Sequence, residues 1–251
     1  MKRHIKIILF SSLLFISLTA YPHNPEEFII SDIELGQLNF ENEQIEKEYE
    51  AALKRLRIRR LGAMSLQKKF LIFIKSGFQH IIPKGFDHIV FILGLFLSCF
   101  KIRPLLIQVT AFTIAHSVTL VLAGIGWIQL PGVLVESLIA LSIVWIAIEN
   151  CMFKKINKWR SLVVFVFGLL HGMGFATVLS QYGLPKENFL SLLLAFNIGV
   201  EIGQLSVLLL AFILIKIIWY KSHGFEKIRI PLSILIGFIG LFWFIERILL
   251  F

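Results

Sequence analysis

The apolar residues of this 251-residue chain are gathered in long runs, separated by short polar stretches that are mostly basic. A helix needs about 20 consecutive apolar residues to cross the hydrocarbon core of a bilayer. Six runs reach or approach that length, so the pattern predicts an all-α, polytopic membrane bundle. The predicted spans lie near residues 86–100, 104–124, 131–150, 161–180, 189–215 and 230–250.

Two segments of different character precede these spans. Residues 1–20 combine a basic start, an apolar centre and a small residue at the end, which is the layout of a secretory signal peptide. An uncleaved anchor is the alternative interpretation. Residues 21–65 form the only long polar stretch, which we expect to be extracytoplasmic. A charged helix is predicted within it from Glu41 to Leu61, acidic first and basic last, an order that suits the helix macrodipole.

The transmembrane bundle is assigned to residues 66–251. Its first apolar run, residues 70–82, is too short to span and contains Lys75, so we expect an interfacial or re-entrant piece. Pro83 and Gly85 then interrupt the chain before the first predicted span.

The charges of the loops predict the orientation of the bundle. The loops after the first, third and fifth spans carry Lys101, Arg103, Lys154, Lys155, Lys158, Arg160, Lys216, Lys221, Lys227 and Arg229. The alternate loops contain only Lys186. Because basic loops remain in the cytoplasm, the first span runs from outside to inside. Residues 21–65 are then outside, which agrees with a signal peptide.

Composition supports a membrane protein and excludes other classes. The chain is 57% hydrophobic with 24 phenylalanines, and its mean hydropathy is +0.82, too apolar for an ordinary soluble domain. The net charge of +9 lies largely in short loops, where lipid headgroups explain it, so we predict no nucleic-acid partner. Cys99 and Cys151 are far apart and indicate neither a disulfide framework nor a thiolate metal site.

Polar residues inside the predicted spans indicate a functional site. An ionisable residue at the bilayer centre costs about 3 kcal/mol, and it normally faces protein, water or an ion. Six such residues lie between the midplane and the outer face, and we predict that they converge on a metal site: Asp87, His88, His116, Glu136, His171 and Glu201. Further polar residues in or at the ends of the spans are Glu149, Asn150, Asn197 and Gln204.

Helical spacing places several of these residues on shared faces. Asn197, Glu201 and Gln204 follow one another at i, i+4 and i+7, which makes one stripe. Small residues at similar levels predict close helix contacts. The glycines assigned to such packing are Gly168, Gly172, Gly174, Gly199 and Gly203.

The mixture of imidazole and carboxylate without thiolate suits a borderline divalent ion such as nickel, cobalt or zinc. A proton relay is an alternative use of the same residues. Three functions are compatible with this mixture. The first, which we favour, is a secondary transporter, since no P-loop is present. The second is an intramembrane zinc hydrolase, in which the histidines hold the ion beside Ser117. The third is an accessory membrane protein that does not transport.

Several ordered motifs together resemble the HupE/UreJ family of bacterial membrane proteins. They include Phe86-Asp87-His88, Phe167-Gly168-Leu169-Leu170-His171-Gly172-Met173-Gly174 and Asn197-Ile198-Gly199-Val200-Glu201. The complete set of matching stretches is 77–88, 110–117, 135–136, 139–142, 149–150, 167–176 and 196–204.

This resemblance implies a multi-pass protein of the bacterial inner membrane. It also implies nickel or nickel–cobalt transport, with hydrogenase or urease maturation machinery as partners. The counterparts of the family's metal-handling residues are His80, Asp87 and His88. Six residues separate His80 from Asp87, one more than in the nickel-transporting members, so the chain resembles a second branch of the family.

Overall fold

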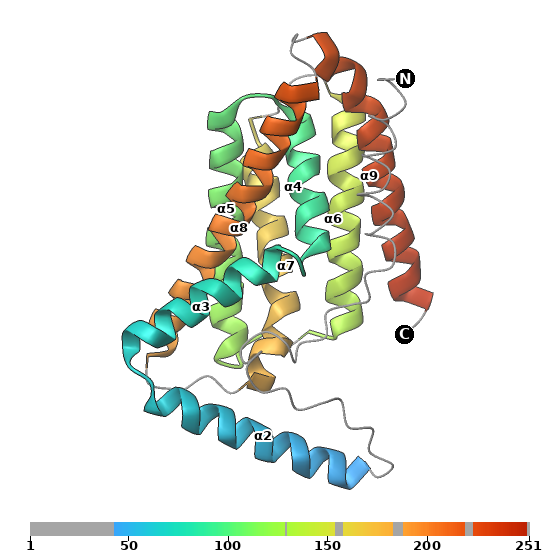
Figure 1. The fold of residues 1–251 in the computed structure, drawn as a ribbon. Helices are drawn as coiled ribbons and strands as arrows, with labels where there is room; N and C mark the ends of the chain where they lie inside the picture. The colour runs from blue at the N-terminus through green and yellow to red at the C-terminus, as the bar shows by residue number, and fades with distance from the viewer. Residues whose placement is uncertain (1–42, 129, 154–157, 183–187, 219–222, 250–251) are drawn as a thin grey trace, which may run out of the picture.

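The structure is a computed structural model that describes residues 43–128, 130–153, 158–182, 188–218 and 223–249. Regular structure in these ranges is entirely helical, as predicted. The helices are α2 (Glu43–Ala63), α3 (Leu66–Ile81), α4 (Phe86–Ser98), α5 (Ile102–Gly124), α6 (Gly132–Met152), α7 (Arg160–Tyr182), α8 (Phe189–Ile218) and α9 (His223–Leu249). The predicted signal peptide and residues 21–42 lie outside the described residues. Figure 1 shows α4 to α9 running lengthwise, with α3 crossing them obliquely and α2 below one end.

The six predicted spans coincide with α4 to α9. By length and apolar composition α5, α6, α8 and α9 can each cross a bilayer. Helices α3 and α4 qualify together as one pair, bent by 69° at the break that Pro83 and Gly85 predict. In α7, the apolar segment Arg160–Gly174 is shorter than these spans and does not qualify as one by length. The chain is therefore a multi-pass helical membrane protein.

Side chains on the outside of the bundle support the same conclusion. Large apolar residues such as Ile107, Trp145, Leu209 and Phe238 are exposed on four different helices. A soluble protein rarely leaves so much apolar surface in water, whereas lipid tails would cover it. The chain buries a second, inward-facing apolar set, which includes Phe112.

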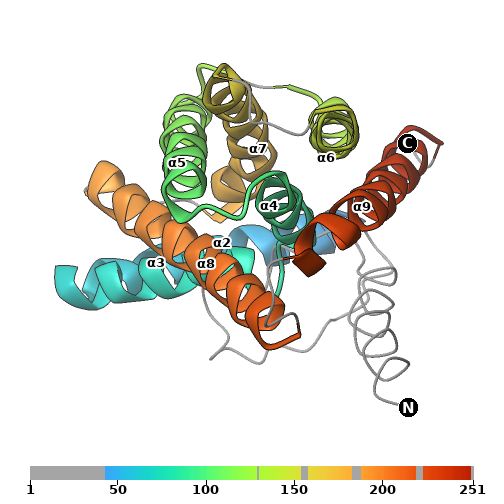
Figure 2. The same cartoon turned by 90° about the horizontal axis from the view of Figure 1, so that it is seen from above.

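Helix α4 occupies the centre of the bundle. It contacts α3, α5, α6, α8 and α9, while the most extensive packing pairs are α5 with α7, α3 with α8 and α6 with α9. The view along the bundle in Figure 2 shows α4 enclosed by its neighbours. The side chains in the first turn of α4 are therefore surrounded by other helices.

Glycines permit the closest of these contacts, as predicted for α7 and α8. A Cβ atom at Gly168 or Gly172 would collide with α5, at the carbonyl oxygens of Phe112 and His116 respectively. Gly199 of α8 lies equally close to the backbone of α3. Larger residues would push these helices apart and displace the side chains between them.

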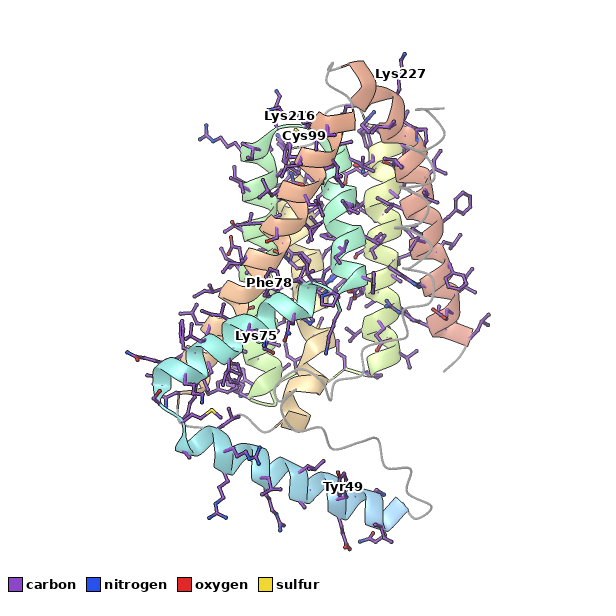
Figure 3. All side chains as sticks on the ribbon, in the orientation of Figure 1. Tyr49, Lys75, Phe78, Cys99, Lys216 and Lys227 are labelled. Carbon is purple, nitrogen blue, oxygen red and sulfur yellow. The ribbon has the colours of Figure 1, made fainter. Side chains whose placement is uncertain are left out.

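Labelled residues mark the two ends of the bundle in Figure 3. Cys99, Lys216 and Lys227 lie at one end, and α2, with Tyr49, lies at the other (Figure 3). The expected interfacial piece is α3, which begins at the α2 end and inserts between its neighbours to mid-height (Figure 1). The break after α3 is thus placed within the bundle.

Candidate metal centre

The turn between α3 and α4 brings three of the candidate residues together. His80 lies in the last turn of α3, and Asp87 and His88 lie in the first turn of α4. Because the helices are bent sharply at this turn, the rings of His80 and His88 approach to 4.8 Å between centroids. A Cβ atom at Gly85 would collide with the His80 carbonyl oxygen, so this tight turn requires glycine.

Helices α5 and α7 each add one histidine to this turn. The ring of His116 lies 6.0 Å from those of both His80 and His88, and the ring of His171 lies 4.8 Å from that of His88. All of these side chains and Asp87 are buried. We call these five residues the histidine cluster.

The histidine cluster contains two overlapping sets of ligand atoms. The first set has one ligand atom from each of His80, His88 and His116, and the second has one from each of Asp87, His88 and His171. Within each set, the three atoms lie within 4.8 Å of one another. His88 belongs to both sets, so it stands between them. The arrangement offers two neighbouring positions for one ion.

A serine on α6 fixes the tautomer of His171. The hydroxyl of Ser142 donates its single hydrogen to the carbonyl oxygen of Ile139 at 2.7 Å. The 3.2 Å contact between Ser142 Oγ and His171 Nε2 therefore requires the imidazole to donate. This assignment, made from the hydrogen-bond network, leaves the lone pair of His171 on Nδ1.

Acceptors on α4 and α8 fix two other imidazoles in the same way. The amide nitrogen of Asn197 donates to the Leu193 carbonyl at 2.9 Å, which turns its oxygen towards Nδ1 of His116 at 3.3 Å. Asp87 Oδ1 lies 2.9 Å from Nδ1 of His88. Both oxygens accept, so both histidines keep their lone pair on Nε2.

The remaining nitrogens are the atoms an ion would bind. Nε2 of His88, Nε2 of His116 and Nδ1 of His171 are buried and have no hydrogen-bond partner among the described residues. Buried polar atoms are normally paired, so three such nitrogens in one cluster need an explanation. Metal-ligating histidines typically donate their other N–H to a carboxylate, carbonyl or similar acceptor, as these three do.

Aromatic side chains close the apolar surroundings of the cluster. Phe91 and Phe112 lie 5.2 and 5.0 Å from the His171 ring, and Phe196 lies 5.6 Å from the His80 ring. These rings exclude bulk water from the imidazoles. A ligand bound there would exchange its hydration shell for protein atoms.

Glu136, which the sequence placed in the same site, lies outside both ligand sets. Its carboxylate is 3.8 Å from Arg247 Nε on α9, and Arg247 also donates to the Glu136 carbonyl oxygen at 2.6 Å. The Glu136 side chain is 38% exposed. Position along the helix predicted that it would join the cluster, but the rotation of α6 turns it towards α9.

The predicted polar stripe of α8 faces α5, and only its first member, Asn197, meets the cluster. Thr110 donates to Glu201 at 2.9 Å and Thr113 donates to Gln204 at 3.0 Å. Ser117 donates to the Thr113 carbonyl at 2.7 Å rather than to a histidine. Glu201 therefore lies beside α5, outside both ligand sets.

A second buried polar cluster joins α4, α5, α6 and α7. Arg160, at the start of α7, contacts Glu149 at 3.0 Å, Gln108 at 3.2 Å and Asn150 at 3.2 Å. Asn150 in turn donates to the Gly94 carbonyl of α4 at 2.8 Å. We call these five residues the arginine network. It contains Glu149 and Asn150, which the sequence analysis had placed at the end of a predicted span.

Three residues whose side chains have roles in these clusters were not predicted from the sequence, namely Arg160, Ser142 and Gln108. Arg160 was counted as a loop charge because it follows a basic stretch, yet it is only 3% exposed. Ser142 had no signal beyond its place in a family motif, because serine is common in helices that pack together. Only the contact with His171 reveals its role.

A comparison with family models agrees with the resemblance found in the sequence. The model described as HupE / UreJ protein matches residues 55–247, which include every helix from α3 to α8 and most of α9. The chain belongs to this family. No curated protein and no solved structure matches the chain.

Proposed function

We propose that this HupE/UreJ protein is a secondary transporter of a divalent transition-metal ion, nickel in the first place, in the cytoplasmic membrane of a bacterium. One observation carries the proposal. Three buried imidazole nitrogens, on His88, His116 and His171, lack a hydrogen-bond partner among the described residues, while the second nitrogen of each ring is held by an acceptor. Nitrogen atoms in this arrangement are suited to bind an ion rather than only to pack against other side chains.

The chemistry of the donors selects the class of ion. Imidazole nitrogen with one nearby carboxylate suits nickel, cobalt and zinc, whereas magnesium and calcium prefer oxygen alone. The free cysteines, Cys99 and Cys151, belong to neither ligand set. Asp87 has two uses here, because one oxygen orients His88 and the carboxylate offsets the charge of an arriving cation.

The overlap of the two ligand sets is compatible with transport. An ion that is conducted must bind well enough to lose water and weakly enough to leave. His88 belongs to both sets, so an ion can move between them while it keeps one ligand. Entry is assigned to the α2 end, from which α3 leads to the cluster (Figure 1).

The test is uptake of radioactive nickel by cells that lack their own nickel permeases. The cells express the wild type or His88→Ala at matched membrane levels. We expect uptake by the wild type and none above background for the variant, because removing the shared ligand lowers affinity by more than the ~100-fold known for outer-shell partners. Nickel titration of the purified proteins separates lost binding from lost movement. Wild-type protein that is present in the membrane without uptake of nickel, cobalt or zinc would refute transport.

An intramembrane zinc hydrolase is the second candidate, and one feature favours it. Each ligand set supplies three protein ligands, which is the number that catalytic zinc sites use while leaving one position open for water. A hydrolase retains its zinc through purification and dialysis, whereas a transporter releases it. Metal content after dialysis against a weak chelator therefore separates the two functions.

A further inference from the structure

The chain between Glu50 and Asp87 has an unusual charge, because it contains no acidic residue. Its basic residues are Lys54, Arg55, Arg57, Arg59, Arg60, Lys68, Lys69, Lys75 and Lys84. Most of them belong to the second half of α2 and to α3, which begins at the end of the bundle opposite Lys216 (Figure 3). The loop charges that orient the spans do not account for this basic stretch, so it needs an explanation of its own.

We propose that an anionic phospholipid binds to the outside of the corner between α2 and α3. Its phosphate lies between Lys68 and Lys75 of α3, and an acyl chain lies in an apolar groove in the first turns of the same helix. Arg59 and Arg60, in the last turns of α2, add positive charge at the corner. The proposal does not depend on metal transport.

The two lysines of the proposed site share one exposed face of α3. Lys68, Leu71 and Lys75 follow one another at i, i+3 and i+7, and all three are exposed. The lysines are separated by about 10 Å along the helix, a gap that two flexible side chains can close around one phosphate. Arg59 and Arg60 are exposed as well.

The described acidic side chains do not neutralise this face. None of them forms an ion pair with Lys68 or Lys75. The acidic residues of α2 end at Glu50, about 14 Å along the helix before Arg59. The main packing partner of α3 is α8, whose acidic residue Glu201 accepts a hydrogen bond from α5. The corner therefore presents cations that an outside anion can pair with.

An open groove lies beside these cations. It has a volume of about 460 Å³ and is lined by Leu66, Gln67, Phe70 and Leu71. Three of the four side chains are apolar, and Leu71 is 67% exposed. Exposed apolar surface rimmed by polar groups marks sites that bind membranes or proteins. Here the apolar groove and the neighbouring cations match the two parts of a phospholipid.

The depth of Lys75 favours a lipid over an acidic peptide. The carbonyl of its neighbour Ile74 lies against Gly199 of α8, and at this level α8 exposes the apolar Ile198 and Ile202. A lysine beside hydrocarbon extends its ammonium group towards the headgroups, where lipid phosphates are the anions within reach. An acidic peptide could pair with the lysines but would leave the groove empty.

Native mass spectrometry of the full chain in detergent tests the site without added metal. The protein is titrated with anionic phosphatidylglycerol or with phosphatidylcholine, which has no net charge. We expect one phosphatidylglycerol molecule to bind roughly tenfold more tightly than phosphatidylcholine, because lysines near an anionic headgroup attract it. Soluble glycerol phosphate should not displace the lipid, since it lacks the acyl chain that the groove holds.

The double variant Lys68→Gln/Lys75→Gln tests the phosphate contacts. Each lysine near an anionic lipid contributes roughly fivefold, so the variant should bind phosphatidylglycerol about 25-fold more weakly. The matched control is Lys101→Gln/Lys216→Gln, which removes two exposed lysines near the opposite end and should bind like the wild type.

A second pair of variants tests the groove. Leu71→Asn should weaken binding, whereas Leu209→Asn, at a leucine of α8 that is 62% exposed, should not. The proposal is overturned if the two lipids bind alike, if glycerol phosphate displaces the lipid, or if the control lysine pair loses as much affinity as Lys68→Gln/Lys75→Gln. Displacement by soluble hexaglutamate, with unchanged binding by Leu71→Asn, would assign the surface to an acidic peptide instead. Absence of nickel uptake would refute transport and leave this site unaffected.

Discussion

The histidine cluster and the arginine network are both buried among the same central helices, but they differ in whether their polar atoms have partners within the protein. In the arginine network each of three guanidinium nitrogens of Arg160 meets an oxygen, from Gln108, Asn150 or Glu149. In the histidine cluster three nitrogens remain without a partner among the described residues. Removing polar atoms from water is unfavourable in both clusters. Only in the arginine network do contacts within the protein offset this unfavourable desolvation free energy.

This difference separates a structural role from a binding role. A paired network holds helices in place, because losing one member exposes the others to an apolar interior. An unpaired set of lone pairs does nothing for the apo protein and becomes favourable when a cation arrives. The comparison predicts that substitutions in the arginine network reduce stability, whereas those around the histidine cluster reduce metal affinity.

The largest effect on stability is expected for Arg160→Met. The substitution leaves Glu149, whose side chain is only 13% exposed, without its cation, a change that costs about 3–5 kcal/mol for buried pairs. The detergent-solubilised variant should unfold at a clearly lower temperature than the wild type. The double variant Arg160→Met/Glu149→Gln should recover part of the loss, because it removes the unpaired charge. Equal unfolding temperatures for the wild type and the single variant would show that the arginine network does not hold the bundle together.

A smaller and different effect is expected for Ser142→Ala. The hydroxyl orients His171 and sets its tautomer, and loss of such outer-shell partners lowers metal affinity by about 10–100-fold. Nickel titration of the purified protein measures the change. Ser137→Ala is the matched control, since Ser137 lies on the same helix and is also buried, but its hydroxyl has no hydrogen-bond partner in the described ranges. If both variants bind like the wild type, Ser142 does not position His171.

The helical architecture could be predicted from the sequence because lipid imposes a simple rule on composition. Each span needs a long apolar run, and the six predicted runs coincide with α4 to α9. The course of α3 could not be predicted, because its apolar run is short and interrupted by Lys75. Its place within the bundle depends on close backbone contact with α8 at Gly199, which no local pattern of α3 reveals.

The candidate site could be predicted only in part, and the reason is geometric. Depth along a helix follows from counting residues, and it brought His116 and His171 to the level of His88. Rotation about the helix axis depends on which neighbours a helix packs against. For that reason Glu136 and Glu201, at suitable depths, lie outside both ligand sets.

The smallest effect is expected for Glu136→Gln, and it tests the boundary of the histidine cluster directly. The carboxylate is partly exposed and its 3.8 Å contact with Arg247 is long, and exposed ion pairs contribute about 0–1 kcal/mol. Nickel affinity should remain within a few-fold of the wild type, because Glu136 belongs to neither ligand set and a change below about 1 kcal/mol is only a few-fold change in an equilibrium constant. The same titration used for Ser142→Ala measures it. A loss of tenfold or more would mean that α6 turns Glu136 inward when the ion binds, and the metal site would then extend towards α9.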